Sequence, residues 1–305
     1  MRDPVSKSHL WKKPCWEKYF RVKTPGEAVQ ILEELQGESR VIAGGTDLLA
    51  RMRQEGFGVK ALVDITCIPG LGEIRSEDGL IRLGAVATPK DLSQSSVLRE
   101  KAFCLAQAAS QIGTPQIRNL GTLGGNLCNA SPAADLAPPL LIFEAKAKIA
   151  GGKGEREVPL DSFFTGPGQT VLNPSEILKE IIIPELRLDA SATFLKLGRR
   201  KAADLALVSV AVLLAMDRKE RTCQLIRIGL GSVAPTPIRA KQAEAFLIGR
   251  RLDDRSIQEA AQSAMRESQP ISDVRASSQY RREMVGVMVE RAIRKCLEQL
   301  EGKDV

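Results

Sequence analysis

The chain has 305 residues, is 43% hydrophobic and 27% charged, and carries a net charge of +7 at pH 7. This composition is typical of a soluble globular protein, and the length favours two domains. No apolar run approaches the roughly 20 residues that span a bilayer, and the basic N-terminal segment lacks the apolar centre of a secretory signal. We therefore expect a cytoplasmic protein with no membrane span.

Several function classes are disfavoured by the residue types present. Aromatic residues make up 4% of the chain and its lysines and arginines are scattered, so we expect no nucleic-acid binding. The six cysteines include no Cys-x-x-Cys pair, which argues against a metal site or iron–sulfur cluster in this chain. The one histidine, His9, lies in the basic N-terminal segment. If the protein is an enzyme, we expect a cofactor, and not a catalytic side chain, to carry the chemistry.

The first domain is expected to cover residues 19–187, after a basic tail formed by residues 1–18. Its predicted elements are, in chain order, a helix from Pro25 with Thr24 as N-cap, a strand over 40–43, a helix from Leu48, strands over 61–65 and 80–85, a helix opened by Thr88, a helix over 97–112, a hairpin over 145–160 and a strand over 176–183.

The second domain is expected to cover residues 188–305 and to differ in its pattern. Three strands are predicted over 193–197, 206–216 and 222–231, followed by helices over 239–249, 254–267 and 277–300. Strands followed by helices indicate an α+β domain.

Two glycine pairs, Gly44-Gly45 and Gly124-Gly125, suggest an anion site. A glycine pair exposes backbone N–H groups, and a helix that starts nearby adds a partial positive charge. Thr46, Thr122 and Asn126 could add side-chain donors. Neither segment matches the G-x-G-x-x-G or P-loop motif, so a Rossmann site is disfavoured. Two such segments in one domain favour a large ligand that contains phosphate.

The roles of several other residues are less certain from the sequence pattern. Asp135 could be a helix N-cap, or it could accept hydrogen bonds from ribose or polyol hydroxyls. Lys196 could be an ordinary surface lysine. The loop from Gly166 to Thr170 could be a plain turn or could lie near a ligand, and Cys128 is expected to serve packing.

Three motifs together resemble a known family. They are VIAGGTDL over 41–48, IRNLGTLGGN over 117–126 and SPAAD over 131–135. This combination resembles the FAD-binding subunit of the molybdenum hydroxylases, which include xanthine, carbon monoxide and nicotinate dehydrogenases. The likeness extends from about Tyr19 to Leu300 and includes TGPGQT over 165–170 and GSVAPTPIR over 231–239.

The resemblance implies an α+β fold, with a two-lobed FAD-binding domain of the PCMH/CO dehydrogenase flavoprotein type before a smaller domain of three strands and helices. It implies that FAD lies between the lobes. Because the one histidine, His9, lies in the N-terminal tail, we expect the FAD to be held without a covalent bond. The residues that it assigns to FAD are Val41, Ile42, Ala43, Gly44, Gly45, Thr46, Asp47, Leu48, Ile112, Gly113, Thr122, Leu123, Gly124, Gly125, Asn126, Ser131, Asp135, Leu178 and Lys196.

The resemblance also implies partners. A large subunit would hold the molybdenum cofactor and a small subunit the 2Fe-2S clusters, in a dimer of heterotrimers that passes electrons through FAD to NAD+ or another acceptor. The first motif contains GGTDL and not the GGHSL typical of carbon monoxide dehydrogenases, and no cysteine-rich insertion is present. We expect a xanthine or purine dehydrogenase-like subunit, with nicotinate, another N-heterocycle or an aldehyde as alternatives. A stand-alone flavin oxidoreductase and a non-catalytic FAD-stabilised assembly subunit are the other possibilities.

Overall fold

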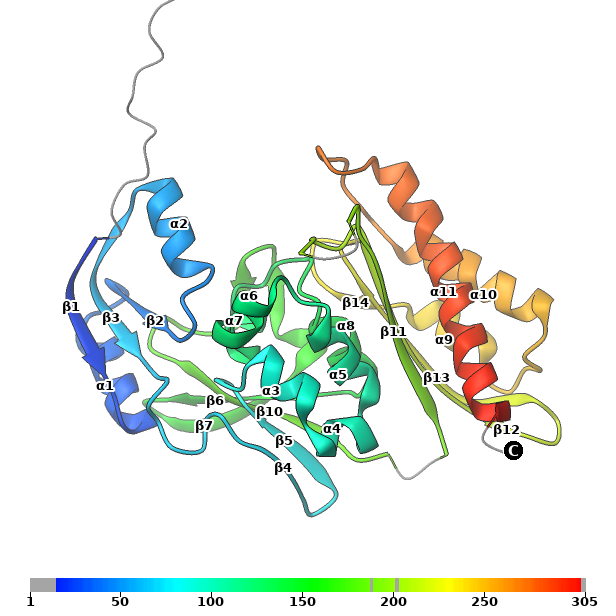
Figure 1. Cartoon of the computed structure of the whole chain (residues 1–305), viewed down its shortest axis with the longest axis horizontal. Helices are drawn as coiled ribbons and strands as arrows, with labels where there is room; N and C mark the ends of the chain where they lie inside the picture. The colour runs from blue at the N-terminus through cyan, green and yellow to red at the C-terminus, as the bar shows by residue number, and fades with distance from the viewer. Residues whose placement is uncertain (1–14, 187–188, 201–202, 303–305) are drawn as a thin grey trace, which may run out of the picture.

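The computed structural model describes residues 15–186, 189–200 and 203–302. The three larger sheets follow one another along the long axis of the molecule, and helices lie between and beside them (Figure 1). Residues 1–14, which include His9 and most of the predicted tail, lie outside the described residues. Among the described helices, none is long and apolar enough to cross a membrane.

The first lobe is a parallel three-stranded sheet in the order β1-β3-β2. Its elements are β1 (Cys15–Arg21), α1 (Pro25–Glu34), β2 (Ser39–Ile42), α2 (Leu48–Glu55) and β3 (Gly58–Asp64). The predicted cap is confirmed, since the Glu27 N–H donates to Thr24 Oγ1 at 3.1 Å. The expected tail was too long, because β1 begins at Cys15 and pairs with β3.

The second lobe is an antiparallel sheet in the order β4-β5-β10-β6-β7. Its strands are β4 (Ile74–Glu77), β5 (Leu80–Gly84), β6 (Lys146–Gly151), β7 (Gly154–Pro159) and β10 (Ile177–Pro184). The helices that share its core are α3 (Pro89–Gln94), α4 (Ser96–Lys101), α5 (Phe103–Ser110), α7 (Leu123–Cys128) and α8 (Ala137–Ile142). Helix α6 (Pro115–Leu120) has no buried residue and contacts α3. A 3₁₀ turn, Leu160–Ser162, leads into a small hairpin of β8 (Phe164–Gly166) and β9 (Gln169–Thr170).

The prediction of one helix over 97–112 is wrong. The segment forms α4 and α5, which are separated at Ala102, where the backbone leaves the helical region with φ −148°. Ala102 is 1% exposed, so the break keeps this short side chain in the core.

The second domain contains the three long strands and three helices that were predicted, which confirms its α+β class. The strands are β11 (Ser191–Leu197), β12 (Val208–Asp217) and β13 (Thr222–Gly231), with a two-residue β14 (Ile238–Arg239) at the edge. The helices are α9 (Lys241–Leu247), α10 (Asp254–Glu267) and α11 (Ser278–Glu301).

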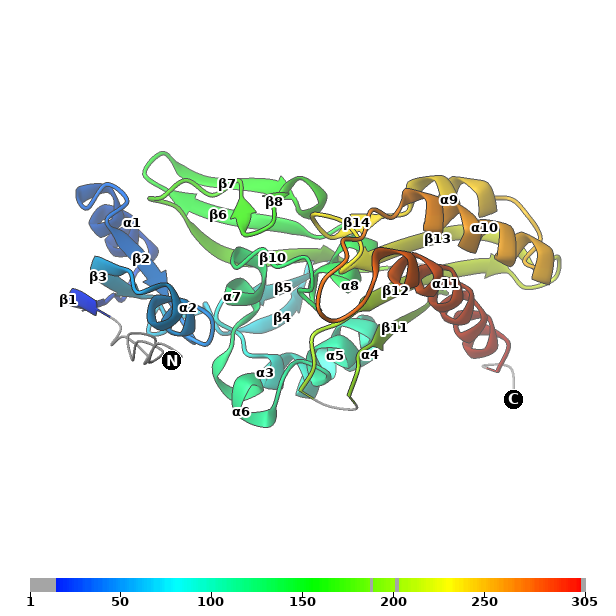
Figure 2. The ribbon, with the colours of Figure 1, turned by 90° about the horizontal axis from the view of Figure 1, so that it is seen from above.

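The sheet of the second domain is covered on both faces (Figure 2). Val210 and Val212 of β12 pack with the helices α9 to α11, whereas Ala211 and Leu213 pack into the core of the first domain. Alternate residues of one strand therefore belong to two cores, as the two-residue period of a strand requires. The two domains are thus joined through a continuous apolar interface.

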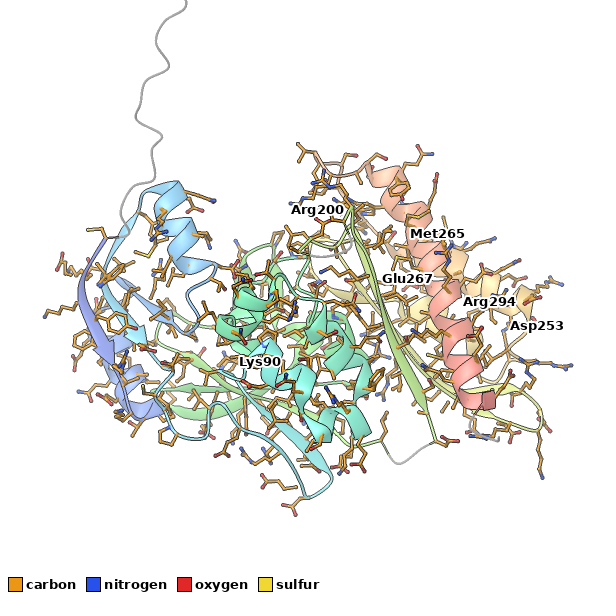
Figure 3. The ribbon with its side chains drawn as sticks, viewed as in Figure 1. Lys90, Arg200, Asp253, Met265, Glu267 and Arg294 are labelled. Atoms are coloured by element: carbon orange, nitrogen blue, oxygen red, sulfur yellow. The ribbon has the colours of Figure 1, made fainter. Side chains whose placement is uncertain are left out.

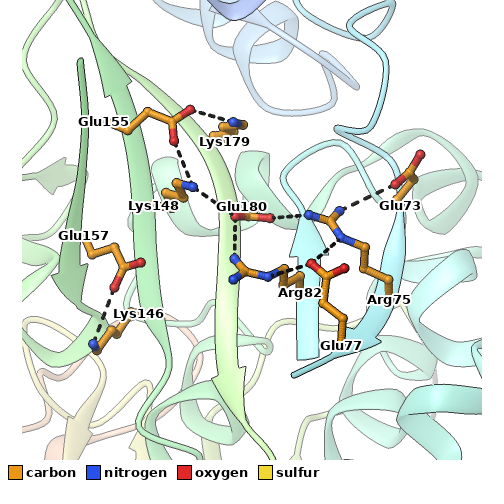
Figure 4. A network of polar contacts seen from close by, with 10 residues as sticks. All are labelled: Glu73, Arg75, Glu77, Arg82, Lys146, Lys148, Glu155, Glu157, Lys179 and Glu180. Atoms are coloured by element: carbon orange, nitrogen blue, oxygen red, sulfur yellow. Dashed lines mark hydrogen bonds and ion pairs between the residues drawn. The ribbon is translucent and has the colours of Figure 1, made fainter. Parts of the chain in front are cut away.

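A charge network crosses the face of the five-stranded sheet that is opposite the helices (Figure 4). Its centre is Glu180 of β10, which is 5% exposed and lies 3.0 Å from Arg82, 3.3 Å from Arg75 and 3.6 Å from Lys148. Helix α1 packs on one end of this face, at Ala150 and Ile177. Long side chains of both charges cover the part around Glu180, where the three cations take the place of water around its carboxylate.

Substitution of Glu180 by alanine should destabilise the protein because it leaves three cations without their shared partner. We expect a loss of about 2 kcal/mol in the free energy of unfolding, since the cations remain partly solvated. The matched control is Glu157→Ala, which breaks an exposed pair with Lys146 at 3.4 Å and should cost less than about 0.5 kcal/mol. Urea unfolding of both variants measures the difference, and equal losses would contradict a central role for Glu180.

Candidate cofactor-binding site

The two glycine segments lie against each other although about 80 residues separate them. A Cβ at Gly44 would lie 1.8 Å from the backbone oxygen of Leu120, so only glycine permits this contact. Gly45 adopts φ +68°, a left-handed conformation that also favours glycine. The end of β2 is therefore placed directly beside the junction of α6 and α7.

A cavity of about 240 Å³ lies at this contact. Twelve of the nineteen predicted residues line it, namely Val41, Ile42, Ala43, Gly44, Gly45, Thr46, Asp47, Leu48, Ile112, Thr122, Gly125 and Asn126. Sequence reasoning did not select seven others that line it, namely Arg51, Pro89, Ile117, Gly121, Cys128, Asn129 and Gly168. Gly168 belongs to the Gly166–Thr170 loop, so this loop lies at the cavity. The Gly168 N–H donates to Ala130 O at 2.9 Å.

The first glycine segment presents unpaired donors to the cavity. The backbone N–H groups of residues 44–47 donate to no acceptor among the described residues. Helix α2 begins immediately afterwards, and its N-cap, Asp47, makes no side-chain capping hydrogen bond. Free N–H groups beside the positive end of a helix favour an anionic ligand.

The second glycine segment differs from the prediction. Gly124 and Gly125 do not precede a helix but form the first turn of α7, which Thr122 caps by accepting from Gly125 N–H at 3.0 Å. A Cβ at Gly124 would lie 2.8 Å from Ala85 O, so Gly124 allows α7 to approach the end of β5. Leu123 is fully buried in the core. Of this segment, Thr122, Gly125 and Asn126 reach the cavity, and Leu123 and Gly124 serve packing.

Asp135 and Lys196 form a buried ion pair, and neither residue lines the cavity. Lys196 Nζ lies 2.6 Å from Asp135 Oδ2, and each side chain is 8% exposed. Burial raises the pKa of Asp135 to about 6, although the Lys196 ammonium acts to lower it. Two of the interpretations are wrong, because Lys196 is not a surface lysine and Asp135 does not cap α8. The binding of cofactor hydroxyls by Asp135 stays a prediction.

The remaining predicted residues lie apart from the cavity. Leu178 belongs to the core of the five-stranded sheet at 3% exposure, and Ser131 Oγ accepts from the Ala133 N–H at 3.2 Å within a turn. Gly113, with φ +45°, lines a neighbouring cavity together with Lys196. The structure therefore collects the residues near 41–48 and 122–126 into one site but places these three elsewhere.

Comparison with known proteins identifies the family. Residues 14–186 match the family model described as the FAD binding domain in molybdopterin dehydrogenase, and residues 193–296 match the CO dehydrogenase flavoprotein C-terminal domain. The chain belongs to the FAD-binding subunits of the molybdopterin dehydrogenases.

Relatives of this flavoprotein subunit differ in the substrates that their names give. The carbon monoxide dehydrogenase medium chain of Hydrogenophaga pseudoflava is 34% identical over 90% of this chain and 95% of its own. The xanthine dehydrogenase FAD-binding subunit of Escherichia coli O157:H7 is 32% identical over 93% of this chain and 97% of its own. A solved carbon monoxide dehydrogenase from Hydrogenophaga pseudoflava superposes with a TM-score of 0.90 at 34% identity, covering 94% of this chain and 99% of that one. Overall similarity therefore favours neither substrate.

The residues of the flavoprotein site fit a cofactor with phosphate and hydroxyl groups. Asn126 Oδ1 and Asp135 Oδ1 are buried and have no partner among the described residues. Buried oxygen atoms without partners are costly, and hydroxyl or amide donors of a bound ligand would satisfy them. Within residues 15–186, 189–200 and 203–302, no group of three His, Cys, Asp or Glu side chains is arranged to hold a metal ion.

Replacement of Gly44 by alanine should separate the two glycine segments, because its Cβ cannot fit against Leu120 O. We expect FAD binding to weaken by more than about tenfold and the free energy of unfolding to fall by about 2 kcal/mol. Gly26→Ala in α1 is the control, since its Cβ meets only Thr24 Oγ1 at 4.0 Å. Fluorescence titration with FAD measures the effect, and normal FAD affinity in Gly44→Ala would refute it.

The stability of the cofactor-free protein should depend on pH through Asp135. Its pKa is about 6 in the folded protein and about 3.9 in the unfolded chain, so the folded state binds the proton more tightly. Below about pH 4 this group contributes its full stabilisation to the free energy of unfolding, roughly 3 kcal/mol at most. The contribution is lost as the pH rises through about 6. The free energies of unfolding of wild type and Asp135→Asn should be measured between about pH 4 and about pH 7. The wild-type value should fall relative to that of Asp135→Asn as the pH rises. A constant difference would contradict this.

Proposed function

We propose that this chain is the FAD-carrying electron-transfer subunit of a molybdenum hydroxylase. The observation that carries the proposal is the cavity that residues 41–48 share with Thr122, Gly125 and Asn126. The backbone N–H groups of residues 44–47 and Asn126 Oδ1 have no partner there within the part of the chain that the structure describes. Membership of the FAD-binding subunit family supports the same cofactor.

Different residues would bind different groups of FAD. The free N–H groups of residues 44–47 and the start of α2 would hold the diphosphate of FAD. Asn126 Oδ1 and Asp135 Oδ1 would accept from amide or hydroxyl donors of the cofactor. Bound FAD supplies the chemistry, which is the exchange of single electrons with iron–sulfur clusters and of electron pairs with an acceptor such as NAD+.

The proposed complex contains a large molybdenum-cofactor subunit and a small 2Fe-2S subunit, arranged as a dimer of heterotrimers. The names of two relatives, a medium chain and an FAD-binding subunit, support a multisubunit enzyme. We favour a xanthine or purine as substrate, and the first motif, which contains GGTDL and not GGHSL, makes carbon monoxide the less favoured substrate. Nicotinate, another N-heterocycle or an aldehyde are the alternatives, and the cytoplasmic location rests on composition alone.

Purification should show which kind of flavoprotein this is. We expect the protein to carry FAD that acid releases into the supernatant, to contain almost no iron and to copurify with a molybdenum subunit and an iron–sulfur subunit. Flavin that stays with the acid precipitate would contradict non-covalent binding. A flavoprotein that oxidises its own substrate without partners would support the stand-alone oxidoreductase. Flavin that NADH does not bleach in the complex would support the assembly subunit.

A further inference from the structure

Within the part of the chain that the structure describes, Arg51 is the one lysine or arginine that lines the cavity proposed for FAD. Helix α2 places it there. Leu48, three residues earlier on α2, also lines the cavity, whereas Arg53, two residues later, does not. Residues three apart share a face of a helix, and residues two apart do not. The register of α2 therefore brings one cation to the cavity and keeps the next one away from it.

The guanidinium group of Arg51 has two nitrogens available for a ligand. Its Nε lies 3.2 Å from Glu55 Oε1, one turn further along α2, and Glu55 does not line the cavity. Nη1 and Nη2 make no hydrogen bond or ion pair with any residue of 15–186, 189–200 and 203–302. These two nitrogens form a planar fork of N–H donors, which matches two oxygens of a phosphate group.

A cation is needed at this cavity if it is to hold a diphosphate. Asp47 is the one carboxylate among the lining residues that the structure describes, so Arg51 and Asp47 leave the lining without net charge. The diphosphate of FAD is a dianion, and the positive end of a helix offers only about half an elementary charge. Without Arg51, the one formal charge on the lining would be the carboxylate of Asp47, which repels an anion.

Two other cations lie close in the sequence to residues of the cavity without lining it. Lys90 follows the lining residue Pro89 at the start of α3, and its side chain is exposed (Figure 3). Arg53 is exposed on α2. Both carry the same charge as Arg51 in the same region of the molecule. They can therefore distinguish a direct contact with the ligand from the general attraction of a positive surface.

We propose that Arg51 binds the diphosphate of FAD through Nη1 and Nη2. The free N–H groups of residues 44–47 would hold one side of the diphosphate, and Arg51 would supply the full positive charge that backbone groups lack. The side chain of Arg51 is 54% exposed, so salt should weaken this contact. The proposal rests on the proposed FAD function and adds a binding residue beyond the glycine segment.

The test measures the binding of FAD by fluorescence titration and the binding of ADP by competition with FAD. ADP contains the diphosphate and lacks the flavin. Arg51→Met should weaken the binding of both ligands by about tenfold, because the lost contact is charge-assisted but partly exposed. The loss should shrink as the salt concentration rises. Arg51→Lys should recover part of the affinity, since lysine keeps the charge but not the fork.

Three variants serve as controls. Lys90→Met and Arg53→Met each remove one positive charge and should stay within about twofold of wild type, because salt screens charges that make no direct contact. Glu55→Gln removes the ion pair of α2 but keeps Arg51, so it should bind both ligands at least as tightly as wild type.

The outcomes separate the explanations. Wild-type affinity in Arg51→Met would overturn the proposal, and so would an equal loss in Lys90→Met, Arg53→Met or Glu55→Gln. A loss for FAD without a loss for ADP would also overturn it, since Arg51 would then act on the flavin end. If Arg51→Met does not fold, a partial loss shared by FAD and ADP in Arg51→Lys supports the proposal, and wild-type affinity there overturns it. A wild-type protein that binds no FAD would instead contradict the proposed function.

Discussion

The backbone contact between Gly44 and Leu120 is the constraint on which the site depends. Because no side chain fits between these segments, the chain just after β2 in the first lobe lies directly against Leu120 and Gly121, at the junction of α6 and α7. Gly124 makes a second close contact, between α7 and Ala85 at the end of β5. Two glycines thus connect both sheets of the first domain through α7, and the cavity lies along this connection.

The second domain contacts the first through an ion pair as well as through apolar side chains. The Lys196–Asp135 pair is buried in the apolar interface between the domains, where an unpaired charge would be strongly destabilising. Each partner therefore requires the other domain to be docked. The Glu180 network also consists of ion pairs, but its cations are partly exposed to solvent. These cations mainly cover a face of the sheet.

Local chemistry made most elements predictable, and long-range contacts explain the failures. Caps such as Thr24 and Thr88 locate helix starts because they act within three residues. Ala102 gave no sign of the break between α4 and α5, since alanine favours helices and the break serves tertiary packing. β1 was missed because all of its residues but Phe20 are exposed and it shows no apolar alternation. The glycine segments could be recognised, but not the Lys196–Asp135 pair, whose members are 61 residues apart.

The position of β10 has a consequence for how the chain folds during synthesis. β10 lies between β5 and β6, and its residue Glu180 pairs with Gly84, which precedes it by almost a hundred residues. The sheet that supports α7 therefore has a gap at its centre until Pro184 has left the ribosome. Pairing over such sequence distances is slow, because loop closure precedes the gain from contacts. The nascent first domain thus exposes the edges of β5 and β6 while every residue proposed to contact the diphosphate has already been made.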